Sequence, residues 1–178
     1  MTFEIYDDFL EREDFEIIKN TFFPKKEDIN NKNKFAWNYL KGIVRDPENG
    51  PTGYEDYDWM YNKPLYSSQD DQLRIDRHYS IVKPIINKLD IDKKLFDVRA
   101  NLLVPTKEHV YHEFHTDRNI PHKVALFYVT NNNGWTILKD TAKVECVENR
   151  MLLFDGMIEH HSVSSTDKAR CVININYN

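Results

Sequence analysis

Short apolar runs alternate with turn signals from Phe96 to the end of the chain, and this pattern limits the possible folds more than any other sequence feature. The segments Asn131–Gly134 and Asp155–Gly156 combine residues that favour turns. Many short strands separated by turns are typical of an all-β sandwich or barrel, so we expect about eight strands here. The predicted strands are Val98–Val104, Val110–Phe114, Val124–Thr130, Trp135–Leu138, Val144–Val147, Met151–Phe154, His161–Val163 and Cys171–Tyr177.

The N-terminal part of the chain has a mainly helical pattern. Apolar residues between positions 9 and 23 recur at helical spacing, and Pro24 is expected to end that helix. A second helix is predicted over residues 74–89, where Pro84 would introduce a kink.

The segment between these two helices mixes several signals. Phe35–Tyr39 alternates like a short strand, whereas residues 47–71 contain the Gly and Pro residues of a loop. Aromatic residues in this loop would either form a lid over a site or pack against the rest of the protein. They are Tyr54, Tyr57, Trp59, Tyr61 and Tyr66.

Together these patterns predict an all-β core with flanking helices (α+β). Residues 96–178 would form a jelly roll, the cupin-like double-stranded β-helix, and residues 1–95 a helical lead-in with lid-like loops. We expect the helices to pack on one face of the jelly roll. A chain of 178 residues has the usual size of one domain, so 1–178 is predicted to be a single domain.

Composition restricts the partners and the compartment. With a net charge of −5, a general electrostatic attraction to nucleic acid or to an anionic membrane is not expected. Two cysteines, Cys146 and Cys171, do not make a disulfide framework. The polar start lacks the pattern of a secretory signal, and no segment reaches the ~18 apolar residues of a membrane span. We expect a cytoplasmic protein.

His115 and Asp117 are the first part of a candidate metal site. Residues two apart on a strand point to the same face, so both side chains can reach one point inside the barrel. An imidazole and a carboxylate are two of the three ligands in the two-histidine, one-carboxylate triad of non-haem Fe(II) oxygenases. By itself, the tripeptide is equally compatible with an exposed strand end.

A second source of histidine follows the strand that ends at Phe154. After a turn, His160 and His161 begin the next strand. Neighbouring residues on a strand point to opposite faces, so only one of the two histidines can face the interior. Taken alone, a surface pair beside Glu159 is the simpler interpretation.

Arg170 opens an otherwise apolar strand. Burying a guanidinium there is unfavourable unless it meets an anion, and its planar fork suits a carboxylate. An ion pair with Asp167 or Asp140 is the structural alternative. The order of the motifs, with Asp117 and His160 separated by enough strands to bring them back together, favours a metal site with an anion-binding arginine.

The order of several segments along the chain adds a resemblance. They are Arg99–Leu102, His115–Asp117, Asn132–Thr136, Leu153–Gly156 with the histidine after it, and Arg170 with Ile173–Tyr177. This combination resembles the Fe(II)- and 2-oxoglutarate-dependent oxygenases, most closely the small prolyl-hydroxylase-like members, including those encoded by bacteriophages. It covers about the C-terminal half of the chain. If a bacteriophage encodes the protein, the expected compartment is the host cytoplasm.

The resemblance implies a role for each candidate metal ligand. His115 and Asp117 would be the first two ligands of Fe(II). The distal histidine of the family usually lies six positions after the phenylalanine that Phe154 matches, which selects His160. Some relatives have a shorter gap to the arginine, and that spacing would select His161 instead.

The resemblance also implies how the cosubstrates 2-oxoglutarate and O2 are used. Arg170 would bind the distal carboxylate of 2-oxoglutarate, and the hydroxyl of Tyr128 would reach the same carboxylate unless Tyr128 is a core residue. Asn101 would face the cosubstrate as well. His112 and His122 do not match the motif, and we interpret them as structural or solvent-facing.

The implied reaction hydroxylates a C–H bond and releases succinate and CO2. The substrate would be a protein or peptide residue, as for prolyl hydroxylases, or a small metabolite, and a nucleobase is less expected for an acidic chain. A metal-binding jelly-roll module and a cupin-type enzyme without 2-oxoglutarate are the alternatives. Arg170 discriminates between them, because neither alternative needs this arginine.

Overall fold

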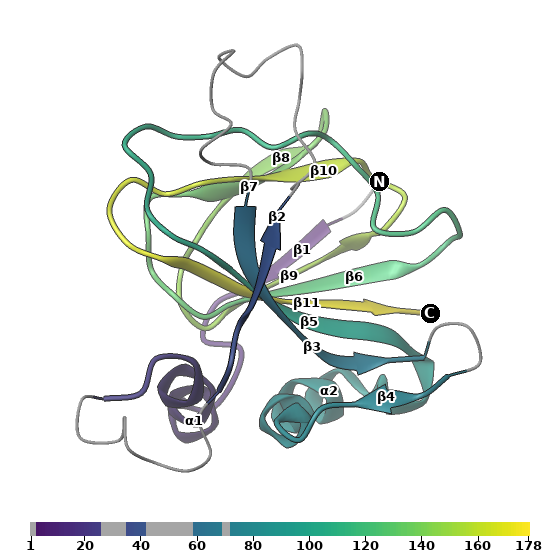
Figure 1. Ribbon diagram of the computed structural model, residues 1–178. Coiled ribbons are helices and arrows are strands. Elements are labelled where there is room, and N and C mark those ends of the chain that lie inside the picture. The colour runs from purple at the N-terminus through teal and green to yellow at the C-terminus, as the bar shows by residue number, and fades with distance from the viewer. Residues whose placement is uncertain (1–2, 26–34, 42–58, 69–71) are drawn as a thin grey trace.

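Two β-sheets of unequal size face each other in the structure, a computed structural model that describes residues 3–25, 35–41, 59–68 and 72–178 (Figure 1). The larger sheet has eight strands in the order β1-β9-β6-β11-β5-β3-β2, with β4 beside β3, and the smaller has the order β10-β7-β8. The strands are β1 (Phe3–Tyr6), β2 (Asn38–Lys41), β3 (Trp59–Ser67), β4 (Arg74–Ile75), β5 (Leu95–Leu103), β6 (Lys123–Tyr128), β7 (Trp135–Leu138), β8 (Ala142–Glu145), β9 (Arg150–Asp155), β10 (His160–Val163) and β11 (Arg170–Tyr177).

Strand β6 shows how the larger sheet is buried on both faces. Leu126 and Tyr128 belong to a core between the two sheets, while Ala125 and Phe127 belong to a second core on the outer face. This alternation follows from the two-residue period of a strand. Because both faces are covered, the central strands are nearly continuous in apolar residues.

The helices cover the outer face of the larger sheet. Phe15 and Ile18 of helix α1 (Arg12–Phe22) and Ile85 of α2 (Lys83–Leu89) are fully buried in the outer core. Figure 1 shows both helices on one side of the sheet, away from the smaller sheet. The predicted fold class, with helices on one face, is therefore confirmed. Among the residues described, no helix has both the length and the apolar character to cross a membrane.

The second predicted helix is only partly correct. Residues 74–89 contain strand β4, a 3-10 turn at Tyr79–Val82 and the shorter helix α2. Pro84 lies in the first turn of α2 rather than inside a longer helix. Proline is favoured there because its missing N–H has no partner in the first turn anyway. Another 3-10 turn, Asp92–Lys94, leads into β5.

Two predictions about the middle of the chain and the sheets are wrong. Residues 59–67 form strand β3 instead of a loop, and the register shifts near Pro64, where proline is tolerated in a sheet. Val110–Phe114 is not a strand, although Tyr111 makes one isolated bridge to Val163. Of the aromatic residues predicted as lid or packing, Tyr54 and Tyr57 lie outside the described residues.

The other members of that aromatic set pack against neighbouring rings. The ring centroids of Trp59 and Tyr61 are 5.5 Å apart, and Tyr39 of β2 lies 5.8 Å from Trp59. Tyr66 packs 5.3 Å from Tyr79. In the described part of the chain these aromatics therefore belong to sheet packing.

Candidate metal centre

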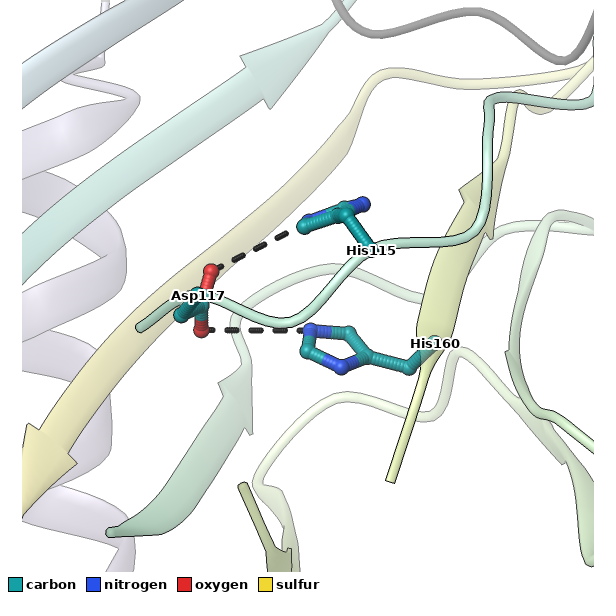
Figure 2. Close-up of side chains that lie close together, drawn as sticks. All are labelled: His115, Asp117 and His160. Atoms are coloured by element: carbon teal, nitrogen blue, oxygen red, sulfur yellow. Dashed lines mark ion pairs between the residues drawn. The ribbon is translucent and has the colours of Figure 1, made fainter. Parts of the chain in front are cut away.

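Three side chains that can bind a metal converge between the two sheets. One ligand atom each from His115, Asp117 and His160 lies within 4.8 Å of the others. The Nε2 atom of His115 is 3.9 Å from Oδ1 of Asp117, and Nε2 of His160 is 3.8 Å from Oδ2. Figure 2 shows both imidazole rings directed at the one carboxylate. All three residues were predicted from the sequence as ligands, and the structure brings them together.

The segment that carries His115 and Asp117 is not a regular strand, contrary to the sequence-based expectation. His115 forms an isolated antiparallel bridge with His160, through backbone hydrogen bonds of 3.1 and 2.9 Å. Asp117 lies beyond this bridge, and its Oδ2 accepts a hydrogen bond of 3.0 Å from Asn174 Nδ2 on β11. The smaller sheet therefore positions the histidines, while the larger sheet orients the carboxylate.

Backbone carbonyls fix the orientation of both imidazole rings. Nδ1 of His115 lies 3.0 Å from the carbonyl oxygen of Glu113, and Nδ1 of His160 lies 3.1 Å from that of Ile158. A carbonyl oxygen can only accept, so in the neutral ring the proton is on Nδ1 and the lone pair is on Nε2. Both lone pairs are then available at the side that faces Asp117.

Burial and neighbouring charges set the protonation of the cluster. Burial alone would raise the pKa of Asp117, but the nearby His160, the hydrogen bond from Asn174 and the charges of His115 and Arg99 together hold that pKa below its usual value. Burial lowers the pKa of His160, despite the opposing effect of Asp117. A carboxylate and neutral imidazoles are the forms in which these groups bind metals.

His161, the alternative ligand, lies in a different environment. Its ring packs edge-on against Phe114 with a centroid distance of 4.4 Å, and the ring of Tyr111 is 6.0 Å away. Strand β10 places neighbouring side chains on opposite faces, and His160 takes the face toward Asp117. The geometry thus favours His160 as the third ligand.

Arg170 is buried at the inner end of the same site, with 4% of its surface exposed. Its Nη2 donates a 2.9 Å hydrogen bond to Thr136 Oγ1, and its Nε is buried without a partner among the described residues. Among the described residues, neither Asp140 nor Asp167 forms an ion pair with Arg170. Asp167 Oδ1 instead accepts a hydrogen bond from the backbone N–H of Asn133. The guanidinium therefore lacks the carboxylate that a buried arginine normally has.

Tyr128 and Asn101 differ in how they approach this region. Tyr128 is fully buried in the core between the sheets, and its hydroxyl donates to Thr136 Oγ1 at 2.8 Å. Burial raises its pKa, so it stays a phenol. Asn101 lines the cavity above the triad, and its Oδ1 is buried without a described partner. Their contact with a cosubstrate stays a prediction.

A cavity of about 320 Å³ connects the triad with Arg170. It is bounded by polar side chains of both sheets and by apolar residues of β2 and β3 such as Leu40 and Met60. Its volume is at the small end of the range for ligand sites. The cavity is large enough for a small dicarboxylate beside the triad.

Sequence reasoning missed three residues of this site. Thr136 joins Arg170 to Tyr128, and Asn174 holds Asp117. His112 was interpreted as structural or solvent-facing, but it is buried and lines the cavity, and burial lowers its pKa to about 4. The alternating pattern of β7 and β11 places Thr136 and Asn174 in strands, but the face they occupy depends on register.

His122 is buried against the β9–β10 turn and does not line the cavity.

No family model and no curated protein sequence matches the chain. Several solved structures, in contrast, are similar to the chain. The viral collagen prolyl hydroxylase vCPH of Paramecium bursaria Chlorella virus-1, in its 2OG complex, has a TM-score of 0.56 and 11% identity over 100% of this chain and 97% of the other. A prolyl hydroxylase from Trichoplax adhaerens in complex with a hypoxia inducible factor peptide fragment has a TM-score of 0.58 and 13% identity, over 98% and 82%.

A third neighbour, AviO1 from Streptomyces viridochromogenes Tue57, has a TM-score of 0.58 and 13% identity over 98% of this chain and 88% of the other. Identities this low establish similarity of fold. The chain therefore has the double-stranded β-helix fold of prolyl hydroxylases and related 2-oxoglutarate- and Fe(II)-dependent oxygenases, as its sequence motifs predicted. The ligand roles of individual residues stay predictions.

Proposed function

We propose that the chain is an Fe(II)- and 2-oxoglutarate-dependent dioxygenase that hydroxylates a C–H bond and forms succinate and CO2. One observation carries the proposal. The triad of His115, Asp117 and His160 shares a cavity with Arg170, a buried guanidinium for which the described residues provide no carboxylate. A metal-binding module or a cupin-type enzyme that does not use 2-oxoglutarate has no need for such an arginine.

The donor set fits Fe(II). Two neutral imidazoles and one carboxylate form the triad that leaves coordination positions open for cosubstrates. His115, Asp117 and His160 would hold the ion, and the carbonyl oxygens of Glu113 and Ile158 would orient the two rings. When bound, Fe(II) supplies the oxidative chemistry that couples decarboxylation of 2-oxoglutarate by O2 to hydroxylation of the substrate.

The inner end of the cavity fits the distal carboxylate of 2-oxoglutarate. Arg170 presents a planar pair of N–H donors to a carboxylate, and Thr136 adds a hydroxyl that already accepts from Arg170 and Tyr128. Asn101, whose Oδ1 has no described partner, lies along the same cavity. The apolar side chains of Leu103, Leu126 and Val172 also line the cavity. They would limit the water beside a bound cosubstrate and so strengthen its contact with the guanidinium.

The substrate class we propose is a residue of a protein or peptide, with a small metabolite as the alternative. The fold shared with prolyl hydroxylases, one of them solved with a peptide fragment, supports the peptide. Leu40 of β2 and Met60 of β3 line the cavity and offer apolar contacts to a substrate.

Separate binding measurements test the two halves of the site. Electron paramagnetic resonance of Mn(II), used in place of Fe(II), measures metal binding by the triad. Calorimetry with N-oxalylglycine, which stands in for 2-oxoglutarate, measures binding at the cosubstrate subsite. We expect His115→Ala and His160→Ala to abolish Mn(II) binding. Arg170→Met should keep Mn(II) and bind N-oxalylglycine at least about tenfold more weakly, because a charge-assisted pair is lost.

His161→Ala is the matched control, because it removes the neighbouring imidazole on the opposite face of β10. It is expected to retain Mn(II) and succinate formation from 2-oxoglutarate. Loss of Mn(II) in this variant, with retention in His160→Ala, would reverse the choice of ligand. Wild-type protein that is folded yet binds neither Mn(II) nor N-oxalylglycine would contradict the proposed activity.

A further inference from the structure

Arg99 lies on the face of β5 that lines the candidate active-site cavity. Its register partner on β11 is Asn174, the residue that holds Asp117. Paired residues of neighbouring strands project to the same face of a sheet, so Arg99 and Asn174 are adjacent at the metal end of the cavity. Arg99 is among the residues that line this cavity, and 36% of its side chain is exposed.

Arg170 lies at the other end of the same cavity. It pairs with Leu103, which is four positions beyond Arg99 on β5. Four residues of strand span about 13 Å, so the two arginines approach the cavity from well-separated positions. Arg170 is buried, whereas Arg99 is partly open to solvent. One guanidinium therefore suits a cosubstrate that is enclosed, and the other suits a molecule that enters from outside.

A buried carboxylate holds the guanidinium of Arg99 in place. Nε and Nη2 both lie 2.9 Å from Oδ1 of Asp97, which is 2% exposed. Asp97 is fixed in turn by Arg118 Nη1 at 3.0 Å and by Asn176 Nδ2 at 3.2 Å. No described residue accepts a hydrogen bond from Nη1 of Arg99. The guanidinium is thus pre-positioned with one edge still available.

The charges around Arg99 do not cancel. Asp97 is the single carboxylate for two guanidinium groups, those of Arg99 and Arg118. Of the other nearby acids, Asp76 is already paired with Lys63 at 2.7 Å and with His78 at 2.9 Å. Asp117, whose pKa Arg99 helps to lower, is a candidate metal ligand. With Asp117 bound to a metal ion, one positive charge would be in surplus at the edge of the cavity, where an anion would be favourable.

A second cleft of about 420 Å³ begins at the same arginine. Arg99 lines both this cleft and the active-site cavity. The cleft runs along β3 and β4, and its other cation is Arg74, whose Nη2 donates a 2.9 Å hydrogen bond to Gln72 Oε1. Arg99 thus marks the point where the metal site continues into an open groove, in which Arg74 and Arg99 lie beside Asp76 and Asp97.

We propose that Arg99 binds a carboxylate of the substrate and so selects acidic substrates. This inference rests on the proposed dioxygenase function. The carboxylate has two chemical sources, an acidic side chain in a peptide that continues into the cleft beside Arg74, or the carboxylate of a small molecule. In either case the fork of Arg99 anchors the substrate while its target C–H bond faces the triad.

Acetate is the probe that tests this site, with Mn(II) and N-oxalylglycine bound so that the triad and the Arg170 subsite are occupied. Paramagnetic relaxation of the acetate methyl protons by Mn(II) measures binding near the metal. We expect saturable enhancement with wild-type protein and at least about tenfold weaker binding with Arg99→Gln, because a charge-assisted contact is lost. Acetamide, a neutral molecule of the same shape, should give no saturable enhancement.

Two further variants control for fold and for general charge. Arg99→Lys keeps a cation beside Asp97 and should bind acetate more weakly than wild type, because the planar fork is lost. If Arg99→Gln does not fold, Arg99→Lys takes its place as the variant that tests acetate binding. Arg74→Gln removes the other cation of the groove and should leave acetate binding unchanged. Equal acetate binding in wild type and in the folded Arg99 variants would overturn the assignment.

Failure of the proposed function has a different signature. If wild-type protein does not bind Mn(II) and N-oxalylglycine, the dioxygenase function and the substrate site are both rejected. If both ligands bind with unchanged affinity but acetate does not respond to Arg99, only the substrate site is rejected.

Competition experiments separate the two sources of the carboxylate. A capped tetrapeptide with one glutamate, its glutamine counterpart and N-acetylglycine are each titrated against acetate. Displacement by the glutamate peptide alone, weakened by Arg74→Gln, identifies a peptide. Displacement by N-acetylglycine alone identifies a small molecule. Equal displacement by the glutamate and glutamine peptides would contradict recognition of a carboxylate.

Discussion

At the scale of single residues, Asn149 shows how one buried side chain connects distant parts of the sequence. Its Nδ2 donates to the carbonyl of Leu10 at 2.8 Å, and its Oδ1 accepts from the Leu10 N–H at 2.9 Å. Its own carbonyl accepts from the N–H of Phe9. Asn149 has a φ of 60°, a conformation that asparagine tolerates better than most residues. The side chain thus fixes the segment that leads into α1.

Replacing Asn149 with alanine should lower the free energy of unfolding by about 2–3 kcal/mol, because both backbone polar groups of Leu10 lose their partner in a buried position. Urea denaturation followed by circular dichroism measures the change. Asn149→Gly, which also loses the side chain but adopts positive φ without strain, should cost less than the alanine variant. An alanine variant within about 0.5 kcal/mol of wild type would show that these bonds contribute little.

At the scale of elements, the turn between β9 and β10 delivers His160 to the site. Gly156 lies in this turn, and its N–H donates to the carbonyl of His122 at 2.9 Å. A Cβ at position 156 would overlap the imidazole of His122. That ring cannot easily move, because it is buried and its Nδ1 lies 2.8 Å from the carbonyl of Ile120. The close approach explains why glycine occupies the turn.

We expect Gly156→Ala to destabilise the protein by about 1–3 kcal/mol through overpacking. His122→Ala removes the ring, so the double variant should lose less stability than the sum of the two single variants. Thermal unfolding of the four proteins completes this double-mutant cycle. Strictly additive losses would mean that the imidazole is not the obstacle. Mn(II) binding, measured in parallel, shows whether the strain reaches His160.

At the scale of the whole molecule, residues between β5 and β6 close the space between the two sheets. His112 belongs to this connection, and it donates a backbone hydrogen bond to the carbonyl of Ser162 at 3.2 Å. Its ring Nδ1 lies 2.8 Å from the same oxygen. Burial lowers the pKa of His112 to about 4, so folding keeps this imidazole neutral well below its ordinary pKa of 6.5. Closure of the sheets is thereby linked to pH.

The sign of this link predicts acid sensitivity of the metal-free protein. Below pH 6.5 the unfolded state binds a proton at His112, and the folded state does not do so until about pH 4. Stability from this residue is therefore complete above pH 6.5 and is lost as the pH falls toward 4, by about 3 kcal/mol in total. The free energy of unfolding, measured by urea denaturation between pH 7 and 4, should fall less steeply with decreasing pH in His112→Asn than in wild type. Parallel slopes would contradict this assignment.

The extent to which single strands were predictable depended on whether their signal was local. Trp135–Leu138 was predicted with the bounds that β7 has, because its turns and apolar period lie within the segment itself. Strand β1 was not predicted, because Phe3–Tyr6 has only four residues, is largely exposed and becomes a strand only by pairing with β9. Strand β3 was missed because its Pro64 is a loop signal in the sequence, whereas in the sheet a register shift accommodates it.

The sequence by itself determined the jelly-roll class and predicted the chemistry of the site, because apolar period, turn residues and ligand types are local properties. His115, Asp117 and Arg170 were predicted as site residues on this basis and on the resemblance. Only the tertiary structure placed His160 beside His115 and Asp117 and brought Thr136 and Asn174 to the site. Which face a strand residue occupies depends on its register with distant strands, and a shift of one residue exchanges the two faces.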